Sequence, residues 1–187
     1  MNTMNLPLFY DPKNVVSDRW IDYMGLQAEA EHVRRAQAVK AAATDRFKIG
    51  LLAIDVQNTF CNPQGELYVG GMTGMGAVDD AQRLVEFIYR NLGVLTNISA
   101  TLDTHRIYAI FHPLFWVDDQ GNHPAPFATI TNRDVVAGTW RPNPLMTSAL
   151  GITLMAAQRH VEHYTAELER NGRYALTIWP YHGILGD

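Results

Sequence analysis

The hydrophobic pattern of the chain is organised around residues 49–60, which read IGLLAIDVQNTF. The short apolar run from Gly50 to Ile54 predicts a strand that is buried on both faces of a parallel sheet. Ligands of open parallel α/β sheets bind beyond the carboxyl ends of the strands. Asp55, the first charge after the run, therefore lies where chemistry is usually done, although a carboxylate at a strand end can also simply cap a turn.

The other periodic segments predict helices over residues 17–43, 78–95 and 145–169, and strands over residues 98–105 and 174–178. Ser17 is the expected N-cap of the first helix, whose aromatic end around Trp20 and Tyr23 should dock onto the rest of the protein. A strand–helix–strand unit of this length favours parallel pairing, which would place Asp55 and Asp103 at the same edge of the sheet.

Residues 106–144 contain proline and turn residues that interrupt every period, and they predict an elaborated loop with short strands and turns. His112, His123 and Trp116 in this region are interpreted as packing residues. The predicted fold is an α/β protein with a mostly parallel sheet. Its organisation is an arm and helix over residues 1–47, followed by a domain over residues 48–187 that is elaborated at 106–172.

The composition of the chain limits the classes of binding partner that we expect. The net charge is −4 and the chain lacks a basic block, which argues against nucleic-acid binding. No apolar run approaches the roughly 18 residues of a membrane span, and the N-terminus lacks the features of a secretory signal, so we expect a cytoplasmic protein. The Ala-rich stretch at 38–43 would lie on a surface or against another subunit, and we expect a homo-oligomer. Cys61, the single cysteine, permits no internal disulfide.

Three side chains suggest a metal site. Asp103 and His105 end the second strand two residues apart, and His182 follows the third strand. Two neutral imidazoles and a carboxylate can bind Zn²⁺, Mn²⁺ or Fe²⁺ and leave positions open to water or substrate. The D-x-H spacing is common, however, and a strand-end Asp that hydrogen-bonds a neighbouring His is the alternative interpretation.

Four motifs together resemble the nicotinamidase/isochorismatase-like cysteine hydrolases: LAIDVQNTF at 52–60, the GELYVGG loop that follows it, TLDTH at 101–105 and IWPYH at 178–182. The resemblance covers roughly residues 48–187 and implies a three-layer α/β/α fold with a mostly parallel sheet. It also implies that Asp55 is the acid of an Asp-Lys-Cys triad and that Phe60 flanks the substrate pocket. Asp103, His105 and His182 would hold a divalent metal, most simply Zn²⁺, and the reaction would be thiolate attack on a small cyclic or heteroaromatic amide.

The chain departs from this family pattern after the IWPYH motif. In the family the lysine and the nucleophilic cysteine come later, whereas here neither occurs in the five residues after His182, and Gly183 stands where nicotinamidases usually carry a cysteine. We therefore expect the N-terminal portion of a longer hydrolase, completed by a C-terminal segment or a second chain. One alternative is a non-catalytic binding or assembly subunit that retains the scaffold and metal. Another is hydrolysis by a metal-bound hydroxide, for which the sequence offers no additional base.

Overall fold

The structure is a computed structural model that describes residues 4–16 and 21–184. It is mixed α/β and divides into two compact units, Met1–Asp103 and Thr104–Asp187. The predicted limit between an N-terminal arm and a hydrolase domain after residue 47 stays a prediction. Each unit is described by itself below.

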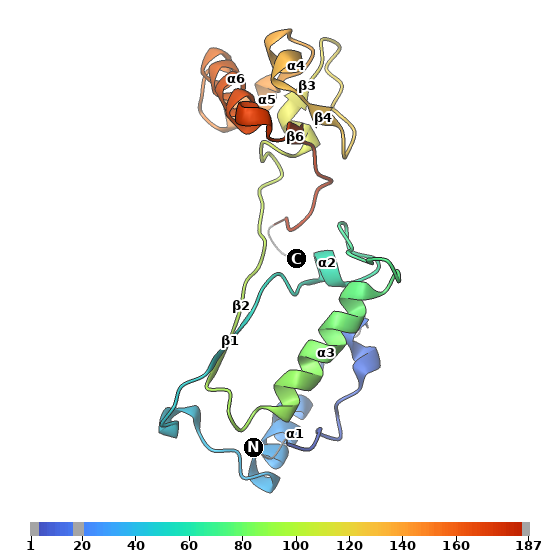
Figure 1. Cartoon of the computed structure of the whole chain (residues 1–187), viewed down its shortest axis with the longest axis vertical. Coiled ribbons are helices and arrows are strands. Elements are labelled where there is room, and N and C mark those ends of the chain that lie inside the picture. The colour runs from blue at the N-terminus through green and yellow to red at the C-terminus, as the bar shows by residue number, and fades with distance from the viewer. Residues whose placement is uncertain (1–3, 17–20, 185–187) are drawn as a thin grey trace. The chain divides into compact units, whose positions relative to one another are not determined.

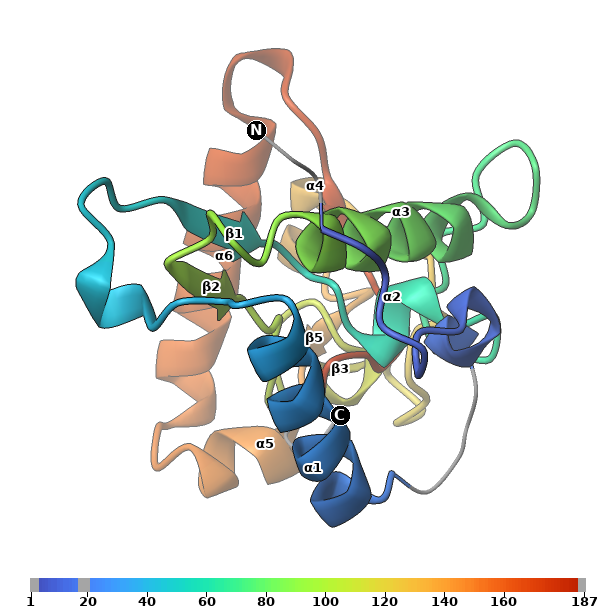
Figure 2. The same ribbon diagram turned by 90° about the horizontal axis from the view of Figure 1, so that it is seen from below.

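The first unit contains, in chain order, η1 (Pro12–Val16), α1 (Tyr23–Ala36), η2 (Ala42–Thr44), β1 (Gly50–Ala53), α2 (Asn58–Cys61), α3 (Gly76–Arg90) and β2 (Asn97–Ala100). Strands β1 and β2 lie side by side and run parallel, with Gly50 opposite Asn97 and Ala53 opposite Ala100 (Figure 1; Figure 2). This confirms the predicted parallel pairing of the strands on either side of α3.

The prediction that β1 is buried on both faces is wrong. Leu52 is 58% exposed and Ile54 is 64% exposed, and every residue of β2 is exposed. The physical reason is that the sheet of β1 and β2 has two strands in the described part of the chain, so each strand has a single neighbour. The apolar sequence of β1 is that of a central strand, but its surroundings here are those of an edge.

Helix α3 has the predicted amphipathic character, with Asp79 in its first turn and Val78 and Ala81 buried. It contacts η1 of the N-terminal arm. The rings of Phe9 and Tyr10 also meet Tyr89 edge-on, with centroid distances of 5.8 and 5.5 Å. The arm is thus held to this helix by aromatic contacts.

Helix α1 is shorter than predicted. Its N-cap is Asp22, whose carboxylate accepts the Gly25 backbone N–H at 3.0 Å; the predicted cap Ser17 and Trp20 lie outside the described residues. The helix stops at Ala36 because Ala38 adopts φ of 52°, in the left-handed region. Tyr23 is 71% exposed, so the part of the aromatic end that is described does not dock as predicted.

The second unit contains η3 (Pro113–Phe115), β3 (Trp116–Val117), β4 (Thr129–Ile130), α4 (Asn132–Val136), β5 (Arg141–Pro142), α5 (Pro144–Ala149), α6 (Leu154–Glu169), η4 (Arg170–Gly172) and β6 (Leu176–Thr177). The short elements over 113–142 confirm the elaborated loop. They surround a hydrophobic core composed of Phe115, Trp116, Ile130, Val135, Val161, Leu176 and Ile178. Helix α6 packs against α4 and β5.

The predicted third strand does not join the parallel sheet. Strand β6 pairs antiparallel with β4, with Thr129 opposite Thr177 and Ile130 opposite Leu176. Leu176 and Ile130 both belong to the core, so the pairing buries two apolar side chains together. The apolar pattern predicted the strand correctly but did not predict which strand it pairs with.

The predicted helix over 145–169 is two helices. Helix α5 ends at Ala149, and Gly151 follows with φ of +67°. Thr153 then caps α6, because its hydroxyl accepts the Ala156 backbone N–H at 3.1 Å. The C-terminal end near Glu169 was predicted correctly, with Asn171 in the left-handed region at φ of 62°.

A search of the described ranges for a transmembrane helix gave a negative result, because none of their helices combines the required length with the required apolar character.

The capping box of α4 gives a pH prediction. Both the hydroxyl and the backbone N–H of Thr131 donate to Asp134 Oδ2, at 2.5 and 2.9 Å, and the hydroxyl's hydrogen bond holds the pKa of this carboxyl below its ordinary value. Asp134→Asn should lower the free energy of unfolding by about 0.5 to 1 kcal/mol at pH 6, since the carboxylate is near solvent.

The sign of the pH dependence follows from the depressed pKa of Asp134. A folded-state pKa below the ordinary value of about 3.9 means that the stabilisation is present above that pH and is lost as the pH falls through the folded-state value. Urea unfolding at pH 6 and pH 3 should therefore show the difference between the two proteins shrinking at pH 3. Asp119→Asn, at an exposed position, is the control, and an equal difference at both pH values would contradict the prediction.

Candidate metal centre

Asp103, His105 and His182 form a cluster that could hold a metal ion. Each offers one ligand atom, and these atoms all lie within 4.8 Å of one another. Asp103 and His105 are half-buried, and His182 is buried. These are the three residues that the sequence predicted as ligands, so the structure brings the predicted set together.

Gln57 positions the backbone of Asp103. Its side-chain oxygen accepts the Asp103 N–H at 2.7 Å, and its amide nitrogen donates to the Asp103 carbonyl at 3.2 Å. Gln57 is itself buried and lies in the segment that follows β1. The two segments that leave the parallel strands are thus joined by a two-point hydrogen bond, which fixes the backbone from which the Asp103 carboxylate projects.

His105 and His182 are held together by the backbone of the chain's last described residues. The His105 N–H donates to the Gly183 carbonyl at 2.6 Å, and His105 forms a parallel bridge with Ile184. The two imidazole rings are 4.9 Å apart between centroids. The Nδ1 atom of His182 is 2.7 Å from the carbonyl of Pro180, so Nδ1 carries the proton, which is the tautomer in which Nε2 can bind a metal.

The donor set suits a divalent ion of intermediate softness. Two imidazole nitrogens and a carboxylate oxygen are ligands of catalytic Zn²⁺ and also suit Fe²⁺ or Mn²⁺. Ligand atoms around a tetrahedral Zn²⁺ lie about 3.3 Å apart, because Zn–N bonds are about 2.0 to 2.1 Å long. With ligand atoms within 4.8 Å of one another, side-chain shifts of about 1 Å toward a common centre would satisfy this geometry.

Asp55 lies at the carboxyl end of β1, as predicted. Its N–H donates to Thr101 Oγ1 at 3.1 Å, and the Thr101 hydroxyl donates to Asp55 Oδ1 at 3.0 Å. Its φ of 55° is in the left-handed region, which Asp tolerates better than most residues. Thr101 directly follows β2, so the carboxyl ends of the two strands lie together, which confirms the predicted shared edge.

Phe60 and Cys61 lie in α2, and both are half-buried. Burial raises the pKa of the Cys61 thiol. A catalytic cysteine requires the opposite shift, toward the thiolate. The structure thus places Cys61 in an environment that disfavours nucleophilic chemistry, and the role of Phe60 beside the substrate stays a prediction.

His112 lies beside two members of this cluster, a position that the sequence did not predict. Its ring is fully buried, and its centroid is 5.9 Å from that of His105 and 5.5 Å from that of His182. The sequence gave no signal for it, because it lies in a loop without periodicity and seven positions after His105. The sequence predicts only a packing role for His112. The fold of the loop decides that its ring contacts those of His105 and His182.

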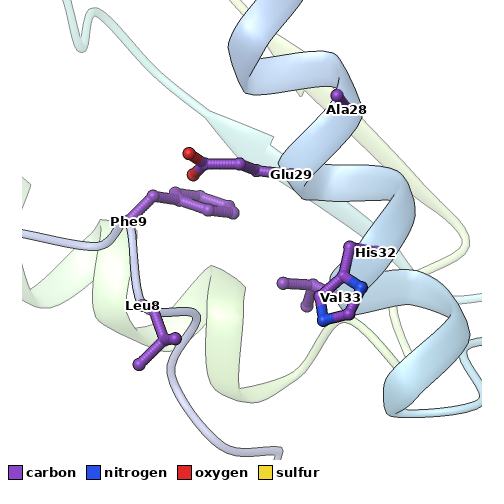
Figure 3. A pocket seen from close by; sticks show the side chains of 6 residues that line it. All are labelled: Leu8, Phe9, Ala28, Glu29, His32 and Val33. Atoms are coloured by element: carbon purple, nitrogen blue, oxygen red, sulfur yellow. The ribbon is translucent and has the colours of Figure 1, made fainter.

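A cavity elsewhere in the first unit contains none of the predicted site residues. Its volume is about 570 Å³, and it lies between the arm and α1, lined by Leu8, Phe9, Ala28, Glu29, His32 and Val33 (Figure 3). The lining is mostly apolar. The chemistry predicted from the motifs is therefore not located in this cavity.

Comparison of the chain with known protein families, with curated proteins and with solved structures found no match. The motifs and the geometry of the cluster are therefore the features that bear on function.

The Gln57 clamp can be tested by its effect on the Asp103 amide. Gln57→Leu leaves the half-buried N–H of Asp103 without its acceptor and should lower the free energy of unfolding by about 1 to 3 kcal/mol. Gln57→Glu keeps that acceptor and should lower the free energy of unfolding by less. Hydrogen exchange of the Asp103 amide, followed by NMR, should be fast in Gln57→Leu and slow in the wild type.

The control for the clamp is Gln64→Leu, at an exposed position in the following loop. Equal protection of the Asp103 amide in the wild type and Gln57→Leu would show that the side chain of Gln57 does not hold this backbone.

Proposed function

We propose that this chain binds a divalent metal ion, most simply Zn²⁺, through Asp103, His105 and His182, and that it forms part of an amidohydrolase for small cyclic or heteroaromatic amides. The observation that carries the proposal is the clustering of these three ligands, which come from segments almost 80 positions apart in the sequence. The resemblance to nicotinamidase/isochorismatase-like hydrolases supplies the reaction class.

When bound, the metal ion would hold the substrate by a ring heteroatom or polarise it. Asp55 would take the proton of the attacking thiol, and the thiolate would add to the amide carbonyl. Asp55 would give this proton to the amide nitrogen, ammonia would leave, and water would hydrolyse the acyl-enzyme. The lysine and cysteine of the triad would come from polypeptide outside these 187 residues, because Cys61 has a raised pKa and lies in α2.

The full domain in this proposal is a three-layer α/β/α structure, in which further strands and helices would cover β1 and β2. The exposed apolar side chains of these strands support that arrangement, since Leu52 of β1 and Ile98 of β2 are 58% and 45% exposed, and Leu102, two positions after β2, is 62% exposed. Burying such side chains is worth about 1.5 to 3 kcal/mol each. Phe60 would then flank the substrate.

A second candidate is a non-catalytic binding or assembly subunit that keeps the scaffold and the metal. The environment of Cys61, which disfavours the thiolate, is the observation that favours it. The two candidates share the metal centre and differ in the nucleophile. The metal centre is therefore the first property to test.

His182→Ala should abolish stoichiometric binding of Zn²⁺ or Mn²⁺, because it removes a buried imidazole whose Nε2 faces away from its own backbone contact. Elemental analysis of the purified protein after metal loading and dialysis measures this directly. His163→Ala removes an exposed histidine of α6 and serves as the matched control. Unchanged metal content in His182→Ala would rule out the ligand assignment.

Substrate binding can be tested without turnover. In the Co²⁺-loaded chain, nicotinamide should change the visible absorption of the ion, since an open coordination position accepts a ring nitrogen. Benzamide, which lacks the ring nitrogen, is the matched control and should leave the spectrum as it is. A spectrum that neither compound changes would favour the non-catalytic subunit.

A further inference from the structure

His112 carries a buried polar atom that the protein leaves without a partner. Its side chain is fully buried, and its Nε2 atom is the buried side-chain nitrogen or oxygen in the described residues that lacks a hydrogen bond. Native structures satisfy nearly all such atoms, by protein groups, water or ions. The unpaired Nε2 atom of His112 is therefore a candidate to bind a ligand.

The other nitrogen of the ring defines its tautomer. Nδ1 lies 3.1 Å from the Arg106 carbonyl and 3.2 Å from the Ile107 carbonyl, and carbonyl oxygens only accept hydrogen bonds. Nδ1 therefore carries the proton, and Nε2 presents a lone pair. A neutral imidazole with an oriented Nδ1–H is the form that binds metals.

The rings of His105, His112 and His182 have the spacing of a three-histidine centre. Their centroids are 4.9, 5.5 and 5.9 Å apart. Three imidazoles bound to one tetrahedral Zn²⁺ have centroids about 5 Å apart, given Zn–N bonds of about 2.0 to 2.1 Å. All three rings belong to the second unit. Edge-to-face packing alone also gives such distances, but it does not account for the orphaned Nε2.

We propose that His112 is a further ligand of the metal centre and binds the same ion through Nε2, which makes His105, His112 and His182 a three-histidine set. This rests on the metal centre of the proposed function. His112 is outside the group whose ligand atoms lie within 4.8 Å of one another, so its ring moves toward the ion when the ion binds. With Asp103 also bound, the ion would accept a substrate atom by expanding to five ligands, as catalytic zinc sites do.

The test uses the full 187-residue chain and Zn²⁺ alone. The main variant is His112→Asn, because the asparagine amide can replace the Nδ1–H that faces the carbonyls of Arg106 and Ile107 but has no atom in place of Nε2. His163→Asn makes the same change at an exposed histidine of α6 and is the matched control. Competition with a chromophoric chelator should show at least about tenfold weaker Zn²⁺ binding for His112→Asn, and no change for the control.

A direct measurement separates a ligand from a nearby residue that only supports one. In the ¹⁵N-histidine-labelled wild-type protein, two-bond correlations report the state of each ring nitrogen. Before Zn²⁺ is added, His112 should show a protonated Nδ1 and a bare Nε2. One equivalent of Zn²⁺ should shift the Nε2 of His112 together with a ring nitrogen of His105 and of His182. Side-chain correlations assign the His112 signals in the wild type, so this measurement does not need the variant to fold.

The outcomes distinguish the two proposals. If Zn²⁺ binds, and His105 and His182 shift while Nε2 of His112 does not, the further inference is wrong and the three-ligand centre of the proposed function stands. If the wild type binds no Zn²⁺, both are wrong. If all three histidines shift, His112 is a ligand.

Discussion

The burial of Ile178 in the core of the second unit is the constraint on which the candidate centre depends. Ile178 is fully buried beside Ile130 and Trp116, and its backbone is fixed on both sides. Its N–H donates to the Ala128 carbonyl at 2.8 Å, and its carbonyl accepts the Phe127 N–H at 2.5 Å. The chain leaves this anchor as Trp-Pro-Tyr-His, so the position of His182 is set four residues after a side chain that cannot leave the core.

The same anchor extends to the other histidines. The Trp179 N–H donates to the Phe111 carbonyl at 2.8 Å, next to His112, and the His105 N–H donates to the Gly183 carbonyl at 2.6 Å. Trp116 adds a hydrogen bond from its indole nitrogen to the Ile110 carbonyl at 2.6 Å. The three histidines are therefore held by backbone hydrogen bonds to a packed core, which is the support that a metal site needs to keep its ligands in place.

In the first unit, the segments that follow β1 and β2 are held differently, by polar contacts. Gln57 clamps the backbone of Asp103, and Thr101 hydrogen-bonds Asp55, while Leu52 and Ile54 of the same segment stay exposed. The hydrogen bond to Thr101 gives Asp55 an ordered position. Cys61 lies in an environment that raises the pKa of its thiol by burial. The chain contains a carboxylate at the end of β1 and three side chains that could hold a metal ion, and burial raises the pKa of its one thiol. This combination is why the proposed function assigns the nucleophile to other polypeptide.

Features that depend on residues close together in the chain could be predicted from the sequence. The period of α3, the apolar run of β1 and the parallel pairing of β1 with β2 were predicted, because local periodicity and strand order encode them. The grouping of Asp103, His105 and His182 was predicted from the motifs and the family resemblance, since His182 is distant in sequence from the other two. The tertiary structure decided the rest. Strand β6 pairs with β4 because Leu176 and Ile130 share a core, and the exposure of β1 depends on which strands surround it. The orphaned Nε2 of His112 likewise exists only once the loop folds, since the burial and hydrogen bonding of an atom depend on residues distant in sequence, which no local pattern records.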